Sequence, residues 1–129
     1  MLTENPHLLL VWREDDALIG HAIWHETSTD EHRAGDSRDV EDQETLRTLC
    51  GGKQENIVEL HELWLTKTHR GKGYGNMFFE FFEDFIRKQG YSFIVYYADH
   101  PAALTLCRKR GWLEGFLPKD NWHVFCLPL

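Results

Sequence analysis

The stretch HRGKGYGN, residues 69–76, combines three glycines with Arg70 and Lys72 and directly precedes an amphipathic segment. Glycines let backbone N–H groups approach an anion closely, and the N-terminus of a helix carries about half a positive charge. This composition predicts a pyrophosphate-binding loop, with a tight strand-to-helix turn as the alternative. The common nucleotide signatures do not fit, because no Gly-Lys is followed by Ser or Thr and G-x-G-x-x-G is absent.

Two glutamates in IVELHELWL, residues 57–65, are candidates for a general base. An alkyl ammonium with a pKa near ~10.4 must lose a proton before its nitrogen can attack a carbonyl carbon. Strand alternation places Glu59 and His61 on one face and Glu62 on the other, unless a β-bulge intervenes. A solvated carboxylate is the alternative interpretation for either glutamate, and His61 is interpreted as a hydrogen-bonded histidine.

A metal site is not expected from the histidines and cysteines. His21 and His25 are four residues apart in a predicted strand, and no third ligand is evident. The three cysteines lack C-x-x-C spacing, which favours reduced thiols over a disulfide framework or a zinc site.

Length, composition and charge limit the class of protein. A chain of 129 residues with 42% hydrophobic content predicts one globular domain, residues 1–129. The net charge of −7 disfavours nucleic acid as a partner and favours a cationic amine. No apolar stretch approaches the ~20 residues that span a bilayer, and no signal peptide is evident, so we expect no membrane partner and a cytoplasmic location.

The elements that must position these residues alternate between strands and helices. A polar turn at residues 14–16 predicts a hairpin, and helical spacing of apolar residues is strongest in NMFFEFFEDFIRKQ. The expected strands are near residues 7–13, 17–25, 57–65, 92–98 and 121–127, and the expected helices are 39–50, 76–89 and 101–111. This order predicts an α/β (α+β) fold with a mixed sheet flanked by helices.

Two motifs at the expected separation resemble one known family. RGKGYG, residues 70–75, is similar to the R/Q-x-x-G-x-G/A signature of the Gcn5-related N-acetyltransferases (GNAT), which lies between that family's fourth strand and third helix. HPAALTLCRKRGW, residues 100–112, resembles the family segment N-x-x-A-x-x-L-Y-x-x-x-G-F. The resemblance covers about residues 7–127 and implies a mixed central sheet that is splayed at the family's fourth strand.

The resemblance implies that acetyl-coenzyme A is a co-substrate, and with the histidine and cysteine spacing above we expect no metal cofactor. Backbone amides of the glycine loop would hold the pyrophosphate, pantetheine would run along the splayed strand, and the Leu65 amide would donate to the thioester oxygen. The implied cofactor-binding residues are Leu63, Trp64, Leu65, Arg70, Gly71, Lys72, Gly73, Tyr74, Gly75, Asn76 and His100.

The resemblance also implies catalytic residues. Glu59 occupies the position at which histone-acetylating members carry their general base, with Glu62 as the nearest competitor. The tyrosine that usually protonates the departing thiolate is replaced by Cys107, which is either a proton donor or a small core residue. Tyr96 and Tyr97, on the neighbouring predicted strand, are the alternative acids, and we take Tyr97 as the candidate catalytic residue of the two.

The implied activity is direct acetyl transfer to a primary amine of a small molecule or peptide. The alternative is a catalytically impaired acetyl-coenzyme A-binding or interaction protein. The first strand and two helices that wall the family's acceptor site have no counterpart here, so we expect a partner subunit, such as a homodimer mate, or the acid-rich segment 27–56 to replace them. Carboxylates in that segment are expected to attract a cationic amine.

Overall fold

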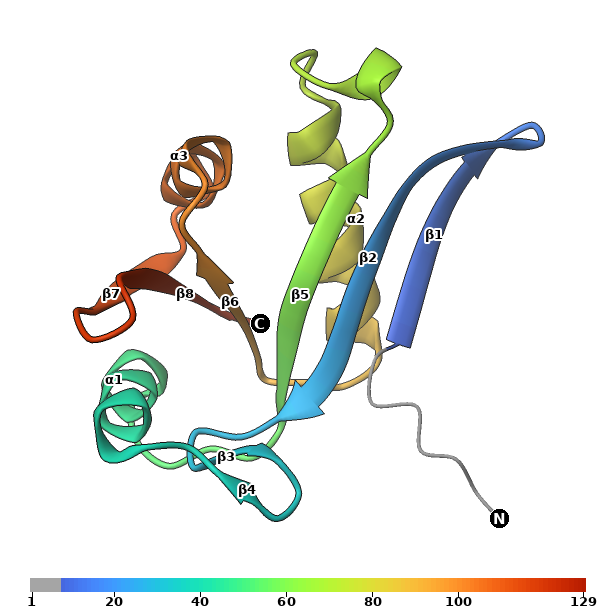
Figure 1. Cartoon of the computed structure of the whole chain (residues 1–129). Coiled ribbons are helices and arrows are strands. Elements are labelled where there is room, and N and C mark those ends of the chain that lie inside the picture. The colour runs from blue at the N-terminus through green and yellow to red at the C-terminus, as the bar shows by residue number, and fades with distance from the viewer. Residues whose placement is uncertain (1–7) are drawn as a thin grey trace.

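The structure, a computed structural model, describes residues 8–129 (Figure 1). The strands are β1 (Leu8–Glu14), β2 (Ala17–Thr27), β3 (Glu31–Arg33), β4 (Asp36–Ser37), β5 (Ile57–Leu65), β6 (Phe93–Ala98), β7 (Leu113–Leu117) and β8 (Trp122–Pro128). The helices are α1 (Val40–Cys50), α2 (Tyr74–Lys88) and α3 (Pro101–Lys109), and a short 3-10 turn covers Lys67–His69. Within residues 8–129, none of the helices has the length and apolar character needed to cross a membrane.

Six of the strands form one sheet in the order β1-β2-β5-β6-β8-β7, in which only β5 and β6 are parallel. The mixed sheet flanked by helices is therefore confirmed. β5 pairs with β6 only over Ile57–Leu60, opposite Phe93–Tyr96. Beyond Leu60 the two strands diverge, as Figure 1 shows between the β5 and β6 arrowheads. The splay expected from the family resemblance lies at this point.

The two faces of the sheet are covered by different helices. α2 and α3 pack on one face, where Phe78, Phe82 and Cys107 join Leu60 and Ile94 in the larger core. Because side chains alternate along a strand, other residues of the same strands face the opposite side of the sheet. On that side, Leu46 and Cys50 of α1 pack with Ile57, Val95 and Val124 in a smaller core. α1 lies beside β7 and β8 (Figure 1).

Most of the expected elements are present close to their predicted bounds. α1 begins after Asp39, whose side chain accepts a hydrogen bond from the Asp42 amide, and it ends at Gly51 in the left-handed conformation (φ 75°). α2 begins at Tyr74, earlier than expected, because Gly73 in the left-handed conformation already starts it. His7, where the first strand was expected to begin, lies outside the described residues.

Two strand features were not expected from the sequence. LEGFL forms the edge strand β7, whose only partner among the described strands is β8, and the short β3 and β4 form a separate hairpin. Leu113 and Phe116 of β7 are largely exposed, so this strand lacks the buried and polar alternation that identifies a half-buried strand. β7 forms as a strand because its backbone pairs with that of β8.

Gly20 of β2 provides a test of this packing. A Cβ at Gly20 would lie 2.5 Å from the backbone oxygen of Trp64 and 2.9 Å from the Phe78 ring. We expect Gly20→Ala to lower the free energy of unfolding by about 1–3 kcal/mol, because β2 must shift away from β5 and α2. Gly75→Ala is the control, since its Cβ would be 3.6 Å from Leu106, an ordinary contact. Equal destabilisation of both variants in chemical denaturation would contradict the prediction.

Candidate active site

The glycine loop joins the end of β5 to the start of α2. Gly71 and Gly73 have φ values of 73° and 83°, and apart from the adjoining residues no atom lies within 4 Å of a Cβ built on either. The first N–H groups of α2, which begins at Tyr74, have no carbonyl partner within the helix. Open space in front of free amides and a helix N-terminus is the geometry that binds phosphate groups.

Arg70 connects the glycine loop to the sheet. Its Nε donates a hydrogen bond to the backbone oxygen of Leu65 at 2.8 Å, which ties the loop to the last residue of β5. Thr66 supports the same corner, since its amide donates to the Ile19 oxygen at 2.8 Å. Arg70 therefore fixes the position of the glycine loop against the sheet.

A cleft of about 380 Å³ opens where β5 and β6 separate. The residues that line it are Leu63, Trp64, Leu65, Arg70, Phe79, Tyr96, His100, Ala102, Ala103 and Leu106. It thus brings the predicted pantetheine strand together with Arg70 and His100. The His100 Nδ1 accepts a hydrogen bond from the Ala102 amide at 3.2 Å, so this histidine caps α3 at the edge of the cleft.

Of the three proposed proton donors, only Tyr96 lines this cleft. Burial, reinforced by the charges of Cys107, Glu62 and Asp99, raises the pKa of its phenol to about 12. Tyr97 points to the opposite face, where its hydroxyl donates to Asp42 at 2.7 Å and accepts from Arg38 at 3.0 Å. Burial also raises the pKa of Tyr97.

Cys107 is fully buried in the larger core beneath α3. Burial raises the pKa of its thiol to about 12. Its neighbour Leu106, one residue earlier, is the side chain that reaches the cleft. The structure thus places Cys107 as a packing residue, one of the two possibilities left open by the sequence.

A β-bulge decides where the two glutamates lie. Leu60 pairs with Trp24 and Glu62 pairs with Ile23, which leaves His61 as the extra residue of β5. The alternation shifts by one at this point, so Glu62 lies on the same face as Glu59, whose partner is His25. Without the bulge, Glu62 would face α2.

Glu62 stands just beyond the point where β5 and β6 separate. Its side chain is 54% exposed and lies 2.7 Å from the Nε2 atom of His21. The His21 ring stacks on Trp64 with centroids 5.3 Å apart, which holds the imidazole beside the carboxylate. Glu62 is therefore open to solvent and has a fixed hydrogen-bond partner.

Glu59 has a contrasting environment. It is 5% exposed, and its Oε1 lies 3.2 Å from His32 Nδ1 and 3.3 Å from Arg38 Nη2. Its Oε2 lies 3.4 Å from His61 Nε2. Burial by itself raises the pKa of Glu59, but the hydrogen bond from His32 and the charges of His32, Arg38 and His25 outweigh it and lower that pKa. Both carboxylate oxygens are thus engaged.

A second cleft, of about 260 Å³, lies on the face of the sheet that carries Glu59. The residues that line it are His32, Arg38, Asp42, Glu59, Tyr97, Leu117, Asp120 and Trp122. Segment 27–56 contributes His32, Arg38 and Asp42, and thus forms one wall. Its acidic character is partly offset, because Asp42 is paired with Arg38 at 3.1 Å.

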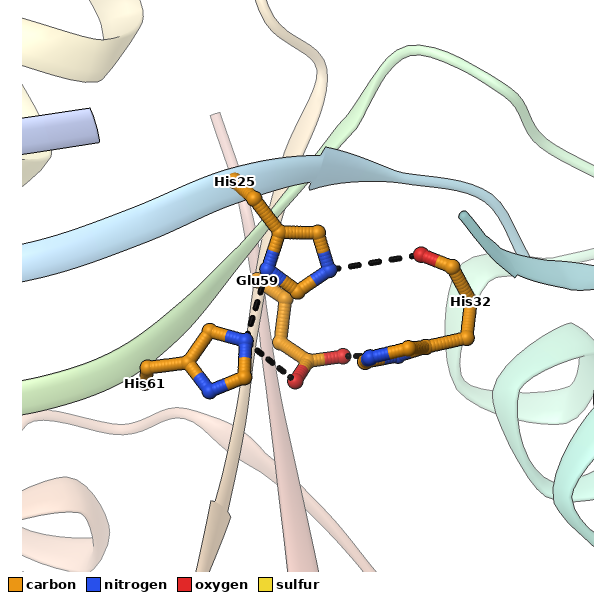
Figure 2. A group of neighbouring side chains, drawn as sticks. All are labelled: His25, His32, Glu59 and His61. Carbon is orange, nitrogen blue, oxygen red and sulfur yellow. Dashed lines mark hydrogen bonds and ion pairs between the residues drawn. The ribbon is translucent and has the colours of Figure 1, made fainter. Parts of the chain in front are cut away.

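Three histidines surround Glu59, as Figure 2 shows. One ligand atom from each of His25, His32, Glu59 and His61 lies within 4.8 Å of the others. Burial lowers the pKa of His25 to about 4. No metal site was expected from the sequence, which offered His21 and His25 without a third ligand. The structure groups His25 instead with His32, Glu59 and His61, and His32 lies in a polar segment whose strand was not expected.

Comparisons with known proteins agree with this geometry. The sequence model described as Acetyltransferase (GNAT) family matches residues 1–112, whereas no curated protein sequence matches the chain. The structure is similar to the PaiA N-acetyltransferase of Thermoplasma acidophilum in complex with coenzyme A, with 15% identity and a TM-score of 0.64. That match covers 96% of this chain but 62% of that protein, which is less than two thirds of its length.

Two further solved structures have the same fold. The ribosomal-protein-S18-alanine N-acetyltransferase of Escherichia coli is 14% identical with a TM-score of 0.60, over 98% of this chain and 71% of that one. A Bacillus subtilis acetyltransferase in complex with coenzyme A is 13% identical with a TM-score of 0.66. That match covers 96% of this chain and 78% of the other.

Proposed function

The chain belongs to the GNAT acetyltransferase family, and from this premise we propose that it transfers an acetyl group from acetyl-coenzyme A directly to a primary amine. The acceptor is a small molecule or a peptide. The observation that carries the proposal is the cleft between β5 and β6, which is continuous in the chain with the glycine loop and the N-terminus of α2.

Coenzyme A would be held by this chain's own backbone. The amides of residues 71–76 would bind the pyrophosphate, because Gly71 and Gly73 leave their surroundings open. The pantetheine arm would lie along Leu63–Leu65, where β5 no longer pairs with β6. His100 and Leu106 would contact it from α3.

We assign the general base to Glu62. It is exposed, lies at the point of strand separation and is positioned by His21. Its carboxylate would take the proton of the attacking amine and pass it to solvent, while the nitrogen forms a bond to the acetyl carbon. Glu59 is the alternative base, but His32, Arg38 and His61 occupy both of its oxygens.

The thioester bond breaks as the tetrahedral intermediate collapses. A thiolate whose parent thiol has a pKa near ~8.5 is a good leaving group, so a hydrogen bond is enough to stabilise it. Tyr96 would donate that hydrogen bond from the wall of the cleft. With a pKa raised to about 12, its phenol keeps its own proton at neutral pH, and the thiolate is protonated by solvent.

The acceptor amine would approach from the opposite face of the sheet. Tyr96 and Tyr97 are consecutive residues of β6, and each lines one of the two clefts. The clefts therefore lie on opposite faces beside the same strand. Asp120 supplies negative charge in the second cleft, which favours a cationic acceptor.

The test is thiol release from acetyl-coenzyme A in the presence of a panel of amines: a polyamine, a lysine-containing peptide, a peptide with a free N-terminus and an aromatic amine. We expect at least one amine to raise thiol release well above the rate without amine, with acetylated amine formed in equal amount. Calorimetric binding of coenzyme A without turnover on any amine would instead support the alternative, an acetyl-coenzyme A-binding protein that has lost catalysis. The buried Cys107 at the family tyrosine position is the observation that favours this alternative.

A further inference from the structure

The cluster around Glu59 is assembled from three strands. His25 comes from β2, His32 from β3, and both Glu59 and His61 come from β5. Their rings and the carboxylate point toward one another (Figure 2). The β-bulge at His61 contributes directly, because it turns this side chain toward Glu59 and His25.

The spacing of the donor atoms suits a small metal ion. Bonds of ~2.0–2.1 Å to imidazole nitrogen or carboxylate oxygen at tetrahedral angles place neighbouring ligand atoms about 3.3 Å apart. His32 Nδ1 lies 3.2 Å from Oε1 of Glu59, and His61 Nε2 lies 3.4 Å from the other oxygen, Oε2. The Nδ1 of His25 and the Nε2 of His61 are 2.7 Å apart, a hydrogen-bond distance. That pair would have to separate by about half an ångström to share an ion.

A neighbouring carbonyl group holds His25 in the tautomer that a metal ion requires. The Nε2 of His25 donates to the backbone oxygen of His32 at 3.3 Å, since a carbonyl oxygen can only accept. Its Nδ1 therefore carries the lone pair and accepts a hydrogen bond from the Nε2 of His61. To bind an ion, His61 would move that proton to its other ring nitrogen. Such a hydrogen bond from the distal nitrogen is the usual support of a metal-binding histidine.

Arg38 does not prevent a cation from binding at this site. Its guanidinium contacts Glu59 Oε1 at 3.3 Å, but it also pairs with Asp42 at 3.1 Å and donates to the Ser28 oxygen at 2.9 Å. Asp42 thus offsets its charge, while the contact with Oε1 fixes the orientation of the carboxylate.

We propose that His25, His32, His61 and the carboxylate of Glu59 bind a single divalent transition-metal ion, Zn²⁺ being the best fit. A set of three imidazoles and one carboxylate suits Zn²⁺ and related first-row ions and not Mg²⁺ or Ca²⁺, which prefer oxygen ligands throughout. The side chains of His32 and His61 are 30% and 32% exposed, which gives the ion a path from solvent.

The ion would attach β3 to the sheet. In the described residues, β3 pairs only with β4 and does not join the six-stranded sheet. A ligand from β3 combined with ligands from β2 and β5 would hold this wall of the second cleft in place. It would also occupy Glu59, which leaves the base role to Glu62.

The first experiment uses the unaltered full chain, freed of metal with a chelator. We expect calorimetric titration with Zn²⁺ to give one saturable site and an increase in melting temperature. Co²⁺ should give the intense visible absorption of a four-coordinate ion. The absence of a saturable site, or a Co²⁺ spectrum of the weak six-coordinate kind, would overturn the proposal.

Variants then assign the ligands. We expect His61→Gln and His32→Gln each to weaken Zn²⁺ binding by about 100-fold or more, since loss of a supporting outer residue alone typically costs 10–100-fold. His123→Gln is the control, because His123 pairs with Glu114 at 2.9 Å outside the cluster. If binding persists in the cluster variants and is lost on changing Cys50, which lies 3.5 Å from Cys126, the ion belongs to the thiols and the proposal is wrong.

Discussion

Glu62→Gln is expected to lower kcat by about 10²–10⁴-fold near neutral pH, the range typical for removal of a general base. In the unaltered protein the Glu62 carboxylate lies 2.7 Å from His21. The amide of the variant has the same size and can keep this hydrogen bond, but it cannot accept the amine proton. Affinity for coenzyme A should be unchanged, because Glu62 does not line the cleft between β5 and β6.

The pH dependence separates this role from substrate positioning. As the pH approaches the pKa of the amine, ~10.4 for an alkyl ammonium, a growing fraction of the acceptor is already neutral. The loss caused by Glu62→Gln should therefore shrink toward high pH. Glu80→Gln, on the exposed side of α2, is the control and should retain full activity. A large loss in Glu59→Gln together with full activity in Glu62→Gln would transfer the base role to Glu59.

Gly73→Asp is expected to raise the Kd for coenzyme A by at least about tenfold. The new carboxylate would stand in the open space beside the N-terminus of α2. Two unit charges ~4 Å apart repel by about 4 kcal/mol at an effective dielectric constant of ~20, and tenfold in Kd corresponds to about 1.4 kcal/mol. The repulsion energy is thus larger than the free energy that corresponds to a tenfold rise in Kd.

Gly73→Asn is the matched control. Asparagine and aspartate have nearly the same shape, both tolerate the left-handed conformation that Gly73 adopts (φ 83°), and both are good N-caps. α2 should therefore form in both variants, and only the charge differs. Calorimetry with coenzyme A should show much weaker binding to the aspartate variant than to the asparagine variant. Equal affinities would mean that the loop does not hold the phosphates.

Features that depend on local chain chemistry were predictable from the sequence. The helix over 39–50 follows from Asp39 as N-cap and Gly51 as its end, and α2 follows from the helical spacing of its phenylalanines. The glycine loop could be identified because Gly71 and Gly73 have positive φ values, which most other residues adopt only rarely. The family followed from this loop and a second motif, and the match over residues 1–112 bears it out.

The arrangement of the site depends on contacts between distant strands. A single bulge residue, His61, exchanges the two faces of β5 and brings Glu62 to the side of Glu59. The register of β6 sends Tyr96 to the cleft and Tyr97 to Asp42. Neither choice has a local signal, because bulges and register depend on the partner strand.

The sequence by itself therefore determined the family, the class of fold and the position of the glycine loop, since each is encoded within a short run of residues. Only the tertiary structure decided which glutamate is exposed at the splay, which tyrosine lines the cleft, and that His32 joins His25 and His61 around Glu59. The residues of the histidine cluster are far apart in the chain, and the two tyrosines are adjacent but lie on opposite faces of the sheet. Their distances are set by strand pairing and by the packing of helices on each side of the sheet.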